Sequence, residues 1–392
     1  MRVLCTCVPG YGHLHPMVPL AQAFQAAGHE VAFATEQRFC RRAEQAGFTA
    51  FPAGLGPGRV AERTLALPGA GDLGPEDTWR FGALMFAAVA APAKVPDLVA
   101  VIDDWAPDLV VHDVTDFAGP VAAAHAGIPW AAHSLGPMFP IEFSRLGAEL
   151  VAPLWQEWGV TPGPLGGMFA SAYLDICPPS LQSPDVDEIR EVAHPLRPVV
   201  FDAVPGEALP TWVDQLAAAP TVYVTLGTLD NEAPGVIEAA VEGLRQEPVN
   251  LIVTVGPNRD PAELGPQPPN VHVERYLPQS LLLPRCDAVV AHGGSGTTLA
   301  ALTHGLPLLL LPQGANQFWN AQRCADLGVG ARLLPGEVRA DAIRGNLRGL
   351  LEQPGYREQA RRIAAEIAAM PGPEEGVAVL EALSRNATVT RR

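Results

Sequence analysis

The sequence predicts an α/β protein made of two doubly wound domains, each with a parallel sheet covered by helices on both faces. Three observations lead to this prediction. Short, continuously apolar segments alternate with segments of helical periodicity, as parallel strands and their covering helices do. The alternation breaks at a proline-rich stretch near 195–210 and restarts at 221–227. The length of 392 residues suits two domains better than a single core.

The first half begins with a βαβ unit. An apolar run at 3–8 predicts a buried strand, the glycine turn at 10–12 opens a helix, and 31–34 forms the next strand. The pattern returns at 108–113, where an apolar strand enters a polar turn. An alanine-rich helix to Gly127 and another strand from Ile128 follow. Two stretches between these elements, 54–96 and 137–179, combine proline, glycine and aromatic residues without clean periodicity. We expect them to form binding loops at the sheet edge.

The second half repeats this architecture. Strands are expected at 221–227, 249–255, 288–290 and 308–311. The domain limits that follow are 1–205 for the first domain, 206–218 for a linker, 219–375 for the second domain, and 376–392 for a C-terminal helix or tail that can pack back toward the first. The two domains are expected to face each other across a cleft.

The charge balance narrows the class of partner. The formal net charge is −16, with 42 acidic and 26 basic residues, which argues against a nucleic-acid partner and against an anionic membrane surface. The apolar N-terminal run is too short for a signal peptide or a membrane span. Six scattered cysteines without a CxxC pair suggest reduced packing thiols. We therefore expect a cytoplasmic protein without stable membrane insertion.

The most specific segment is His-Gly-Gly-Ser-Gly-Thr-Thr-Leu at 292–299, directly after an apolar strand and at the start of a helix. Glycines allow close backbone approach, and free N–H groups at a helix start favour an anion. Ser295, Thr297 and Thr298 add hydroxyl groups, and His292 can donate to a phosphate oxygen. The segment lacks the lysine of a Walker loop and the dinucleotide glycine fingerprint. These N–H groups, hydroxyls and the histidine are suited to bind a diphosphate.

Two flanking motifs strengthen this interpretation. Tyr276-Leu277-Pro278-Gln279 precedes the glycine segment, and Leu-Pro-Gln-Gly-Ala-Asn-Gln-Phe at 311–318 follows it. Both stand at ends of predicted strands, where open α/β sheets bind ligands. The run from Tyr276 to Gly330 resembles the nucleotide-sugar signature of family 1 glycosyltransferases, especially bacterial enzymes that decorate natural products such as antibiotics. The two-domain layout extends this resemblance over nearly the whole chain.

The resemblance implies a GT-B fold, in which two Rossmann-like domains face each other across an interdomain cleft. The first domain would bind the acceptor and the second the nucleotide sugar. An aromatic ring in this family stacks on the base, a role that falls to Tyr276 with the backbone of Leu277 reading the base edge. The full set of donor-binding residues that it implies is Gly12, Thr228, Tyr276, Leu277, Gln279, His292, Gly294, Ser295, Gly296, Thr297, Asn316 and Gln317.

Two positions depart from the family pattern. Many relatives have aspartate where this chain has Asn316, which leaves the hydroxyl pattern of the donor sugar open. Many relatives also have a glutamate that holds both ribose hydroxyls where this chain has Ala300. That substitution favours a deoxythymidine diphosphate sugar, with a uridine diphosphate sugar as the alternative.

A base can be assigned in the first domain. His13 precedes Pro16, an expected first-turn residue, so its ring should lie at a helix N-terminus, where the helix dipole disfavours imidazolium. Asp113 ends a parallel strand at the same sheet edge and can hold the ring. The resemblance implies that this pair is catalytic. His15 could line the acceptor pocket or cap the turn, and Asp116 is an alternative carboxylate in what would otherwise be a solvated turn.

The expected reaction is inverting transfer of a sugar to an acceptor hydroxyl, without a metal or other cofactor. The only Asp-x-Asp match, 185–187, lies in a proline-rich polar stretch, and we interpret it as surface. Aromatic and apolar residues of the two irregular regions could wall a pocket for a small apolar acceptor such as a polyketide or macrolide. These candidates are Trp79, Phe81, Phe86, Phe139, Phe143 and Met168.

Other functions stay open. A transferase for lipid or cell-wall precursors should show a basic or apolar membrane patch. A non-catalytic helper would bind the nucleotide sugar and activate a partner transferase without turnover. A nucleotide-sugar epimerase is disfavoured by the glycine motifs. The sequence leaves the acceptor, the donor sugar, O- or C-glycosylation and a homodimeric state undecided.

Overall fold

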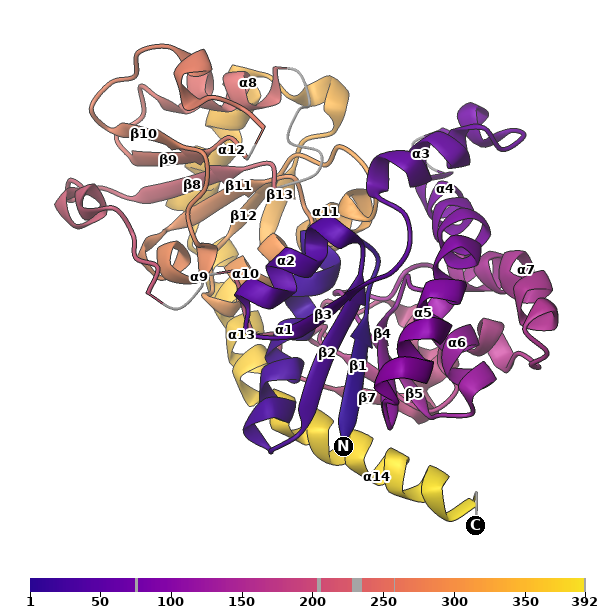
Figure 1. The fold of residues 1–392 in the computed structure, drawn as a ribbon. Coiled ribbons are helices and arrows are strands. Elements are labelled where there is room, and N and C mark those ends of the chain that lie inside the picture. Colours follow the sequence, from indigo (N-terminus) through magenta and orange to yellow (C-terminus); the bar gives the residue numbers. More distant parts are fainter. Residues whose placement is uncertain (75–76, 203–205, 228–234, 257, 391–392) are drawn as a thin grey trace. The chain divides into compact units, whose positions relative to one another are not determined.

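The computed structural model describes residues 1–74, 77–202, 206–227, 235–256 and 258–390, with the side chains of 387–390 excluded. The chain forms two compact units (Figure 1). The first comprises Met1–Cys177, Gln182–Arg197 and Met370–Arg392, and the second Pro178–Leu181 and Pro198–Ala369. The expected linker, 206–218, therefore falls within the second unit.

Within the described residues, the first unit contains a seven-stranded parallel sheet in the order β3-β2-β1-β4-β5-β6-β7. The first six positions follow the doubly wound order, which reverses between β1 and β4. The strands are β1 (Arg2–Thr6), β2 (Glu30–Thr35), β3 (Thr49–Pro52), β4 (Leu109–Asp113), β5 (Trp130–His133), β6 (Tyr173–Asp175) and β7 (Ala193–Pro195).

Helices cover both faces of this sheet, with α1 and α2 on one side and α5, α6 and α7 on the other (Figure 1). The helices are α1 (Tyr11–Ala26), α2 (Gln37–Gln45), α3 (Pro57–Leu65), α4 (Thr78–Ala83), α5 (Ala91–Trp105), α6 (Ala118–Ala126), α7 (Ile141–Glu157) and α14 (Pro373–Thr390). A π-helix, η3 (Leu84–Ala90), joins α4 to α5, and short 3₁₀ turns include η1 (Ala70–Asp72), η4 (Pro164–Gly167) and η5 (Pro184–Val192).

The two regions expected to be irregular loops are largely helical. The first contains α3, α4 and η3, and the second contains α7. The expectation was wrong for a physical reason. A π-helix changes the residue period, so η3 does not show an α-helical pattern of apolar residues. In α7, Pro153 interrupts the sequence pattern without ending the helix.

One helix among the described residues, Thr78–Trp105, is long and apolar enough to cross a membrane, with a mean hydropathy of 1.7. One side of it packs into the hydrophobic core of the first unit. The core residues on this helix are Ala83, Ala87, Ala91, Val95, Leu98 and Ile102. A core helix meets the same criteria of length and composition, so this helix is weak evidence for a membrane span.

In the described part of the second unit, a six-stranded parallel sheet has the order β10-β9-β8-β11-β12-β13, again doubly wound. The strands are β8 (Thr221–Thr225), β9 (Asn250–Thr254), β10 (Val271–Glu274), β11 (Ala288–Ala291), β12 (Leu308–Leu310) and β13 (Gly330–Arg332). The helices are α8 (Val236–Leu244), α9 (Gln279–Leu282), α10 (Ser295–Thr303), α11 (Gln317–Asp326), α12 (Ala340–Glu352) and α13 (Pro354–Ala369), and shorter 3₁₀ turns include η6 (Thr211–Gln215) and η7 (Pro261–Leu264). Its core lies between the sheet and helices α8 and α12.

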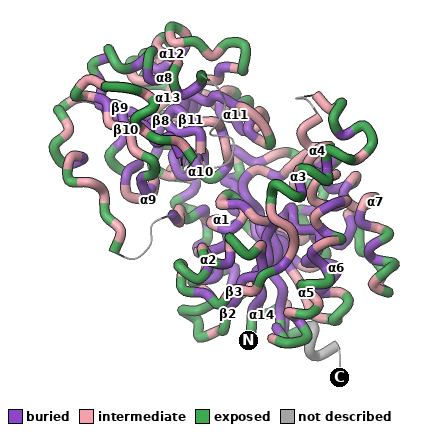
Figure 2. The backbone as a smooth tube through the Cα atoms, turned by 45° about the horizontal axis from the view of Figure 1, so that its top comes forward, coloured by how far each residue is buried: buried purple, intermediate pink, exposed green. Residues whose placement is uncertain are grey.

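Burial follows this layering. The strands of both sheets are buried along most of their length, whereas the helices expose their outer faces (Figure 2). The C-terminal helix α14 belongs to the first unit and packs along α1. His29 contributes a hydrogen bond from Nε2 to Oε1 of Glu381 at 2.9 Å. The C-terminal segment thus completes the covering of the first sheet.

Candidate active site

The carboxyl ends of β1 and β4 lie at the reversal point of strand order in the first sheet, where doubly wound proteins bind ligands. The chain leaves β1 through the turn that starts α1, and β4 ends at Asp113. His13 and Asp113 are 100 residues apart in sequence, yet Nδ1 of the histidine lies 3.4 Å from Oδ1 of the aspartate. The strand order is what brings them together.

His13 lies in the first turn of α1, after the extended N-cap residue Gly10. A Cβ atom at Gly10 would lie 2.8 Å from Cδ2 of His13, so the ring needs a glycine at this position. No side chain caps this helix start. The His13 side chain is 17% exposed, and the Phe86 ring on η3 contacts it edge to face at 5.9 Å between centroids. One part of the imidazole is thus open while another is covered by an aromatic ring.

Asp113 is completely buried, and both of its carboxylate oxygens accept hydrogen bonds. Oδ2 accepts from the Val8 backbone N–H at 2.8 Å. Oδ1 accepts from the backbone N–H of Thr115 at 2.7 Å and from its hydroxyl at 2.5 Å. Burial raises the pKa of Asp113, but the charge of His13 and the hydrogen bonds from His13 and Thr115 outweigh burial and hold the pKa below its ordinary value. The carboxylate is therefore ionised beside the imidazole.

A buried ion pair supports the same strand ends. Lys94, the only lysine in the chain, donates from Nζ to Oδ2 of Asp116 at 2.6 Å and to the backbone oxygen of Cys7 at 2.7 Å. The Thr6 hydroxyl also donates to Asp116, at 2.7 Å. Asp116 therefore does not lie in a solvated turn. Lys94 was not among the predicted site residues, although its being the only lysine in an arginine-rich chain was an available signal.

Two further histidines near this edge are neutral. His133 ends β5 in register with Asp113 and donates from Nδ1 to the backbone oxygen of Ser134 at 2.7 Å. Burial lowers the pKa of His133 to about 4. His15 accepts a hydrogen bond from Arg42 at 3.3 Å, and burial together with the Arg42 charge lowers its pKa to about 3. His15 therefore anchors α2 to the start of α1.

The second unit carries a glycine-lined cradle at the corresponding reversal point, between β8 and β11. His292 follows β11, and α10 begins at Ser295. A Cβ atom would lie 2.7 Å from the His292 ring at Gly227 and 2.4 Å from it at Gly294, so both glycines are required by the ring position. Burial lowers the pKa of His292 to about 4, and its Nδ1 is buried without a hydrogen-bond partner among the described residues.

The start of α10 is available to an anion. Its N-cap residue, Gly294, has no side chain, and no side-chain cap hydrogen bond is made to the helix. Four N–H groups at a helix start lack partners within the helix, and the helix dipole adds partial positive charge there. Together with the neutral His292, this helix start offers hydrogen-bond donors, and the first turn of α10 contains no acidic residue.

Amide side chains from α11 order the loops around the cradle. Asn316 and Asn320 donate from Nδ2 to Oγ of Ser295 at 2.9 and 3.1 Å. Oε1 of Gln317 accepts from the backbone N–H groups of Gln313 and Gly314, at 2.8 and 3.2 Å. Asn316 and Gln317 thus lie beside the cradle and also hold its backbone. Asn320 was missed by sequence analysis because it lies one helical turn beyond the motif.

The Tyr276 ring is 44% exposed, although its hydroxyl is held by a hydrogen bond of 2.6 Å to the backbone oxygen of Asp202. The Asp202 carboxylate also accepts from the backbone N–H groups of Gln279 and Ser280 at the start of α9. The Gln279 amide reaches Oγ1 of Thr297 on α10, at 3.3 Å. A flat, exposed ring is therefore fixed next to the glycine cradle. Leu277 is buried, and Thr228 lies outside the described residues.

The expected acceptor residues divide into two groups. Trp79, Phe81, Phe86 and Phe139 are half-buried, and they keep surface that a ligand could contact. Phe143 and Met168 are fully packed in the core of the first unit, where Phe143 stacks against neighbouring rings. Because they are buried, those two side chains offer no surface to an acceptor.

The surface interpretation of the Asp-x-Asp motif agrees with its surroundings. Asp187 is exposed and pairs with Arg190 in the same turn, and Asp185 accepts from the backbone N–H of Ile141 at 3.0 Å. Within the residues that the structure describes, no group of three or more histidine, cysteine, aspartate or glutamate side chains is arranged to hold a metal ion.

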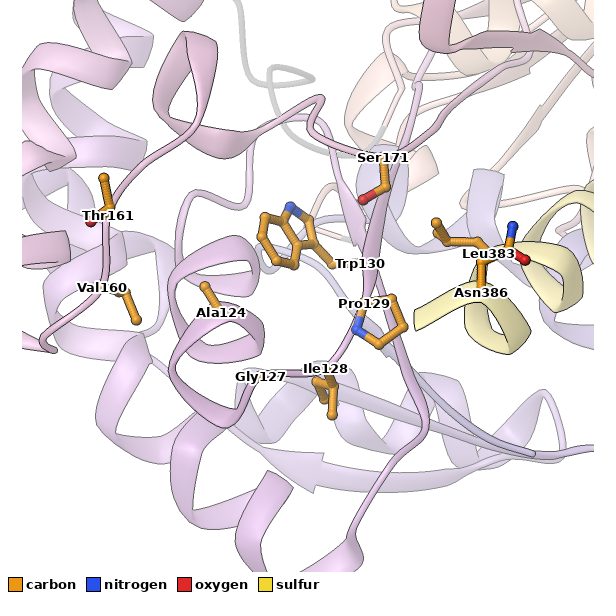
Figure 3. A pocket seen from close by; sticks show the side chains of 10 residues that line it. All are labelled: Ala124, Gly127, Ile128, Pro129, Trp130, Val160, Thr161, Ser171, Leu383 and Asn386. Carbon is orange, nitrogen blue, oxygen red and sulfur yellow. The ribbon is translucent and has the colours of Figure 1, made fainter. Parts of the chain in front are cut away.

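A separate cavity of about 530 Å³ opens at the opposite edge of the first sheet (Figure 3). Trp130 at the start of β5, the end of α6, and Leu383 and Asn386 of α14 line it. It lies at the amino ends of the strands, whereas Asp113 and His133 lie at the carboxyl ends. The cavity is thus distinct from the candidate site.

Comparison with solved structures identifies the class. Glycosyltransferases of the GT-B fold combine two doubly wound sheets, and this chain is one of them. It is similar to the glycosyltransferase SnogD from Streptomyces nogalater, with a TM-score of 0.77 and 33% identity over 98% of this chain and 99% of that one. It is also similar to the glycosyltransferase VinC in complex with dTDP, with a TM-score of 0.81 and 28% identity over 98% and 100% of the two chains.

Sequence comparison identifies the family. The chain belongs to the erythromycin biosynthesis protein CIII-like family, whose N-terminal domain matches residues 80–227 and whose C-terminal domain matches residues 244–383. L-demethylnoviosyl transferase of Streptomyces niveus is 35% identical and covers 99% of this chain and 100% of its own length. Aclacinomycin-T 2-deoxy-L-fucose transferase of Streptomyces galilaeus is 31% identical, over 98% and 96%. The predicted fold and the predicted class, a bacterial natural-product glycosyltransferase, are confirmed.

Proposed function

We propose that this enzyme transfers a deoxysugar from a nucleoside diphosphate, dTDP in preference to UDP, to a hydroxyl of a small apolar natural product, with inversion and without a metal ion. The observation that carries the proposal is the buried Asp113 carboxylate held against Nδ1 of His13 at the start of α1. A histidine oriented by a buried carboxylate is suited to act as a general base.

In the proposed step, Nε2 of His13 takes the proton of the acceptor hydroxyl. The acceptor oxygen forms a bond to the anomeric carbon, and the bond from that carbon to the diphosphate oxygen breaks on the opposite face. The electron pair of the broken bond leaves with the nucleoside diphosphate. Asp113 stabilises the imidazolium that forms, because its carboxylate is ionised beside the ring.

The leaving group would be stabilised by the cradle of the second unit. The start of α10 and the neutral His292 supply N–H donors at the position where the diphosphate charge increases. A preorganised set of such donors can replace a cation in this role. The proposal of a metal-free reaction rests on this donor set.

Tyr276 supports a pyrimidine nucleotide, and Ala300 favours thymidine over uridine. The exposed Tyr276 ring can stack on a pyrimidine base. Ala300 is buried in α10 and offers no carboxylate to ribose hydroxyls. Among the similar structures, the spinosyn rhamnosyltransferase SpnG is complexed with thymidine diphosphate and VinC with dTDP.

The acceptor proposal rests on the half-buried aromatic side chains of the first unit. Phe86 lies against the proposed base, so an apolar ring system that contacts Phe86 would have its hydroxyl near His13. Flat aromatic or macrocyclic polyketides suit such a surface. The relatives named as transferases for aclacinomycin and tylactone are consistent with this class.

Product formation tests the proposal directly. Purified enzyme is incubated with a panel of dTDP- and UDP-sugars and polyketide acceptors, with EDTA, and products are identified by mass spectrometry and by NMR of the anomeric proton. We expect transfer with inversion that persists in EDTA and falls at least about 100-fold in His13→Ala. His304→Ala, which removes an exposed histidine of the second unit, is the matched control. Retention of configuration, loss of transfer in EDTA, or a fully active His13→Ala would refute it.

A further inference from the structure

Thr115 lies between the two proposed catalytic residues, and its side chain is completely buried. Its Oγ1 is 2.5 Å from Oδ1 of Asp113 and 3.2 Å from Nδ1 of His13. The direct contact from Nδ1 of His13 to Oδ1 of Asp113 is longer, at 3.4 Å, and is therefore the weaker of the two hydrogen bonds of this ring nitrogen. The hydroxyl of Thr115 is therefore the nearer partner of the histidine.

The proton positions follow from the chemistry of the three groups. An ionised carboxylate only accepts, so the short contact to Asp113 must use the Thr115 hydroxyl proton. The hydroxyl oxygen then has only lone pairs left for His13. Nδ1 must carry a proton to donate to that oxygen, and Nε2 of the neutral ring is left with its lone pair. The arrangement selects one of the two imidazole tautomers.

We infer that Thr115 is a positioning residue that sets the tautomer and ring orientation of His13 through its hydroxyl. The inference deepens the proposed function and rests on it, since it concerns the same base. It departs from a simple histidine–aspartate pair. The hydroxyl oxygen accepts a hydrogen bond from Nδ1 of His13, and the hydroxyl donates a hydrogen bond to Asp113. No group is transferred, and the hydroxyl proton stays on oxygen.

The Thr115 hydroxyl is not needed to hold the carboxylate. The backbone N–H of Thr115 already donates to Oδ1 of Asp113 at 2.7 Å, and the Val8 N–H donates to Oδ2 at 2.8 Å. Both donors remain in any variant at residue 115 other than proline. A Thr115→Val variant keeps the branched shape and replaces the hydroxyl by a methyl group. It removes the hydroxyl's contacts to His13 and to Asp113 together, while the two backbone donors still hold the carboxylate.

The first readout is steady-state kinetics with saturating donor. We expect kcat of Thr115→Val to fall by about 10- to 100-fold with KM for the acceptor changed less than about 2-fold, because the contact orients the base and does not bind substrate. Thr115→Ser, which keeps the hydroxyl, should retain most of kcat. Equal losses in the serine and valine variants would overturn the inference, since the loss would then not follow the hydroxyl, which serine keeps and valine lacks.

The second readout is independent of turnover. In protein labelled with ¹⁵N-histidine, the ring nitrogen shifts report which nitrogen of His13 carries the proton, and the His13→Ala spectrum identifies its signals. We expect the Nδ1–H tautomer in the wild type and in Thr115→Ser, and a mixture or the Nε2–H tautomer in Thr115→Val. An unchanged tautomer together with unchanged kcat in Thr115→Val would refute the role of Thr115. If Thr115→Val does not fold, Thr115→Ala is compared with Thr115→Ser in the same way.

These results separate the inference from the function on which it rests. A fully active His13→Ala variant refutes the proposed histidine base, whichever tautomer His13 has in the wild type. Loss of activity in His13→Ala, with wild-type kinetics and an unchanged tautomer in Thr115→Val, keeps the proposed function and sinks the role of Thr115.

Discussion

Removing the only lysine should destabilise the first unit strongly. In Lys94→Met the apolar stem is approximately replaced, but Asp116 loses its counter-charge while remaining almost fully buried, at 1% exposure. Among the described residues, the carboxylate keeps two hydrogen bonds, from the Thr6 hydroxyl and from the backbone N–H of Ala118. Removing one member of a buried ion pair costs about 3–5 kcal/mol, because an uncompensated charge stays in the interior.

The magnitude can be converted into a melting temperature. For a domain of about 150–250 residues, each kcal/mol shifts Tm by about 2–4 °C, so Lys94→Met should lower the Tm of the first unit by about 6–20 °C. Differential scanning calorimetry measures this shift. Arg41→Met, which removes an exposed cation from the same unit, is the control and should change Tm little.

A chemical assay gives a second measure. In the wild type, an amine-reactive reagent should label the α-amino group but leave Lys94 unmodified until the first unit opens, because Lys94 is 3% exposed. One reagent group per protein molecule, on the α-amino group, therefore indicates folded protein. A second reagent group, on Lys94, indicates that the first unit has opened. A Tm for Lys94→Met within error of that of Arg41→Met, or rapid labelling of Lys94 under native conditions, would refute the reasoning.

Three further predictions follow from the structure. Burial raises the pKa of Asp175 from 3.8 to about 6. Between about pH 4 and 6 the native state therefore holds a proton that the unfolded state has released. The contribution of Asp175 to the free energy of unfolding falls as pH rises through this window. The free energy of unfolding of Asp175→Asn minus that of the wild type should thus rise by on the order of 3 kcal/mol between pH 4 and 7, measured by urea unfolding; a pH-independent difference would contradict this. Gly294→Ala should weaken dTDP binding at least about 10-fold in calorimetry, because its Cβ would lie 2.4 Å from the His292 ring, whereas Gly345→Ala, whose Cβ meets nothing within 4 Å, should bind as the wild type does. Tyr276→Phe should keep the affinity for dTDP and Tyr276→Ala should reduce it by about 10-fold, as stacking requires; equal losses would assign the effect to the hydroxyl.

The continuously apolar strands and their order along the chain could be predicted from the sequence, because a strand covered on both faces must be apolar along its length. The predicted strands at 31–34, 108–113, 221–227 and 288–290 correspond to β2, β4, β8 and β11. Five short strands were missed: β3, β6, β7, β10 and β13. They have three or four residues each and, unlike the equally short β11 and β12, are not continuously apolar. Pairing with longer neighbours determines their structure.

The candidate donor cradle was accessible to sequence reasoning because its parts are local. A strand, a glycine turn and a helix start follow one another within 288–303, so the glycine positions relative to His292 can be read directly. The required closeness of Gly294 to the His292 ring is a short-range consequence of that order. Gly227 is different, because it reaches the same ring from the end of β8, the neighbouring strand.

The sequence alone determined the fold class, the family and the residue types that could carry out the chemistry, because hydrophobic periodicity and glycine spacing are properties of neighbouring residues. The sequence predicted that His13 meets Asp113, but the contacts of Thr6, Lys94 and Thr115 at these strand ends came only from the tertiary structure. His13 and Asp113 lie 100 residues apart, Thr6 and Asp116 lie 110 apart, and each pair forms because β1 and β4 are neighbours in the sheet. Burial likewise depends on the folded chain. Asp116 forms an ion pair because it is buried, since the free energy of a charge depends on its surroundings and not on its residue type. The fold also places Thr115 between the proposed base and its carboxylate.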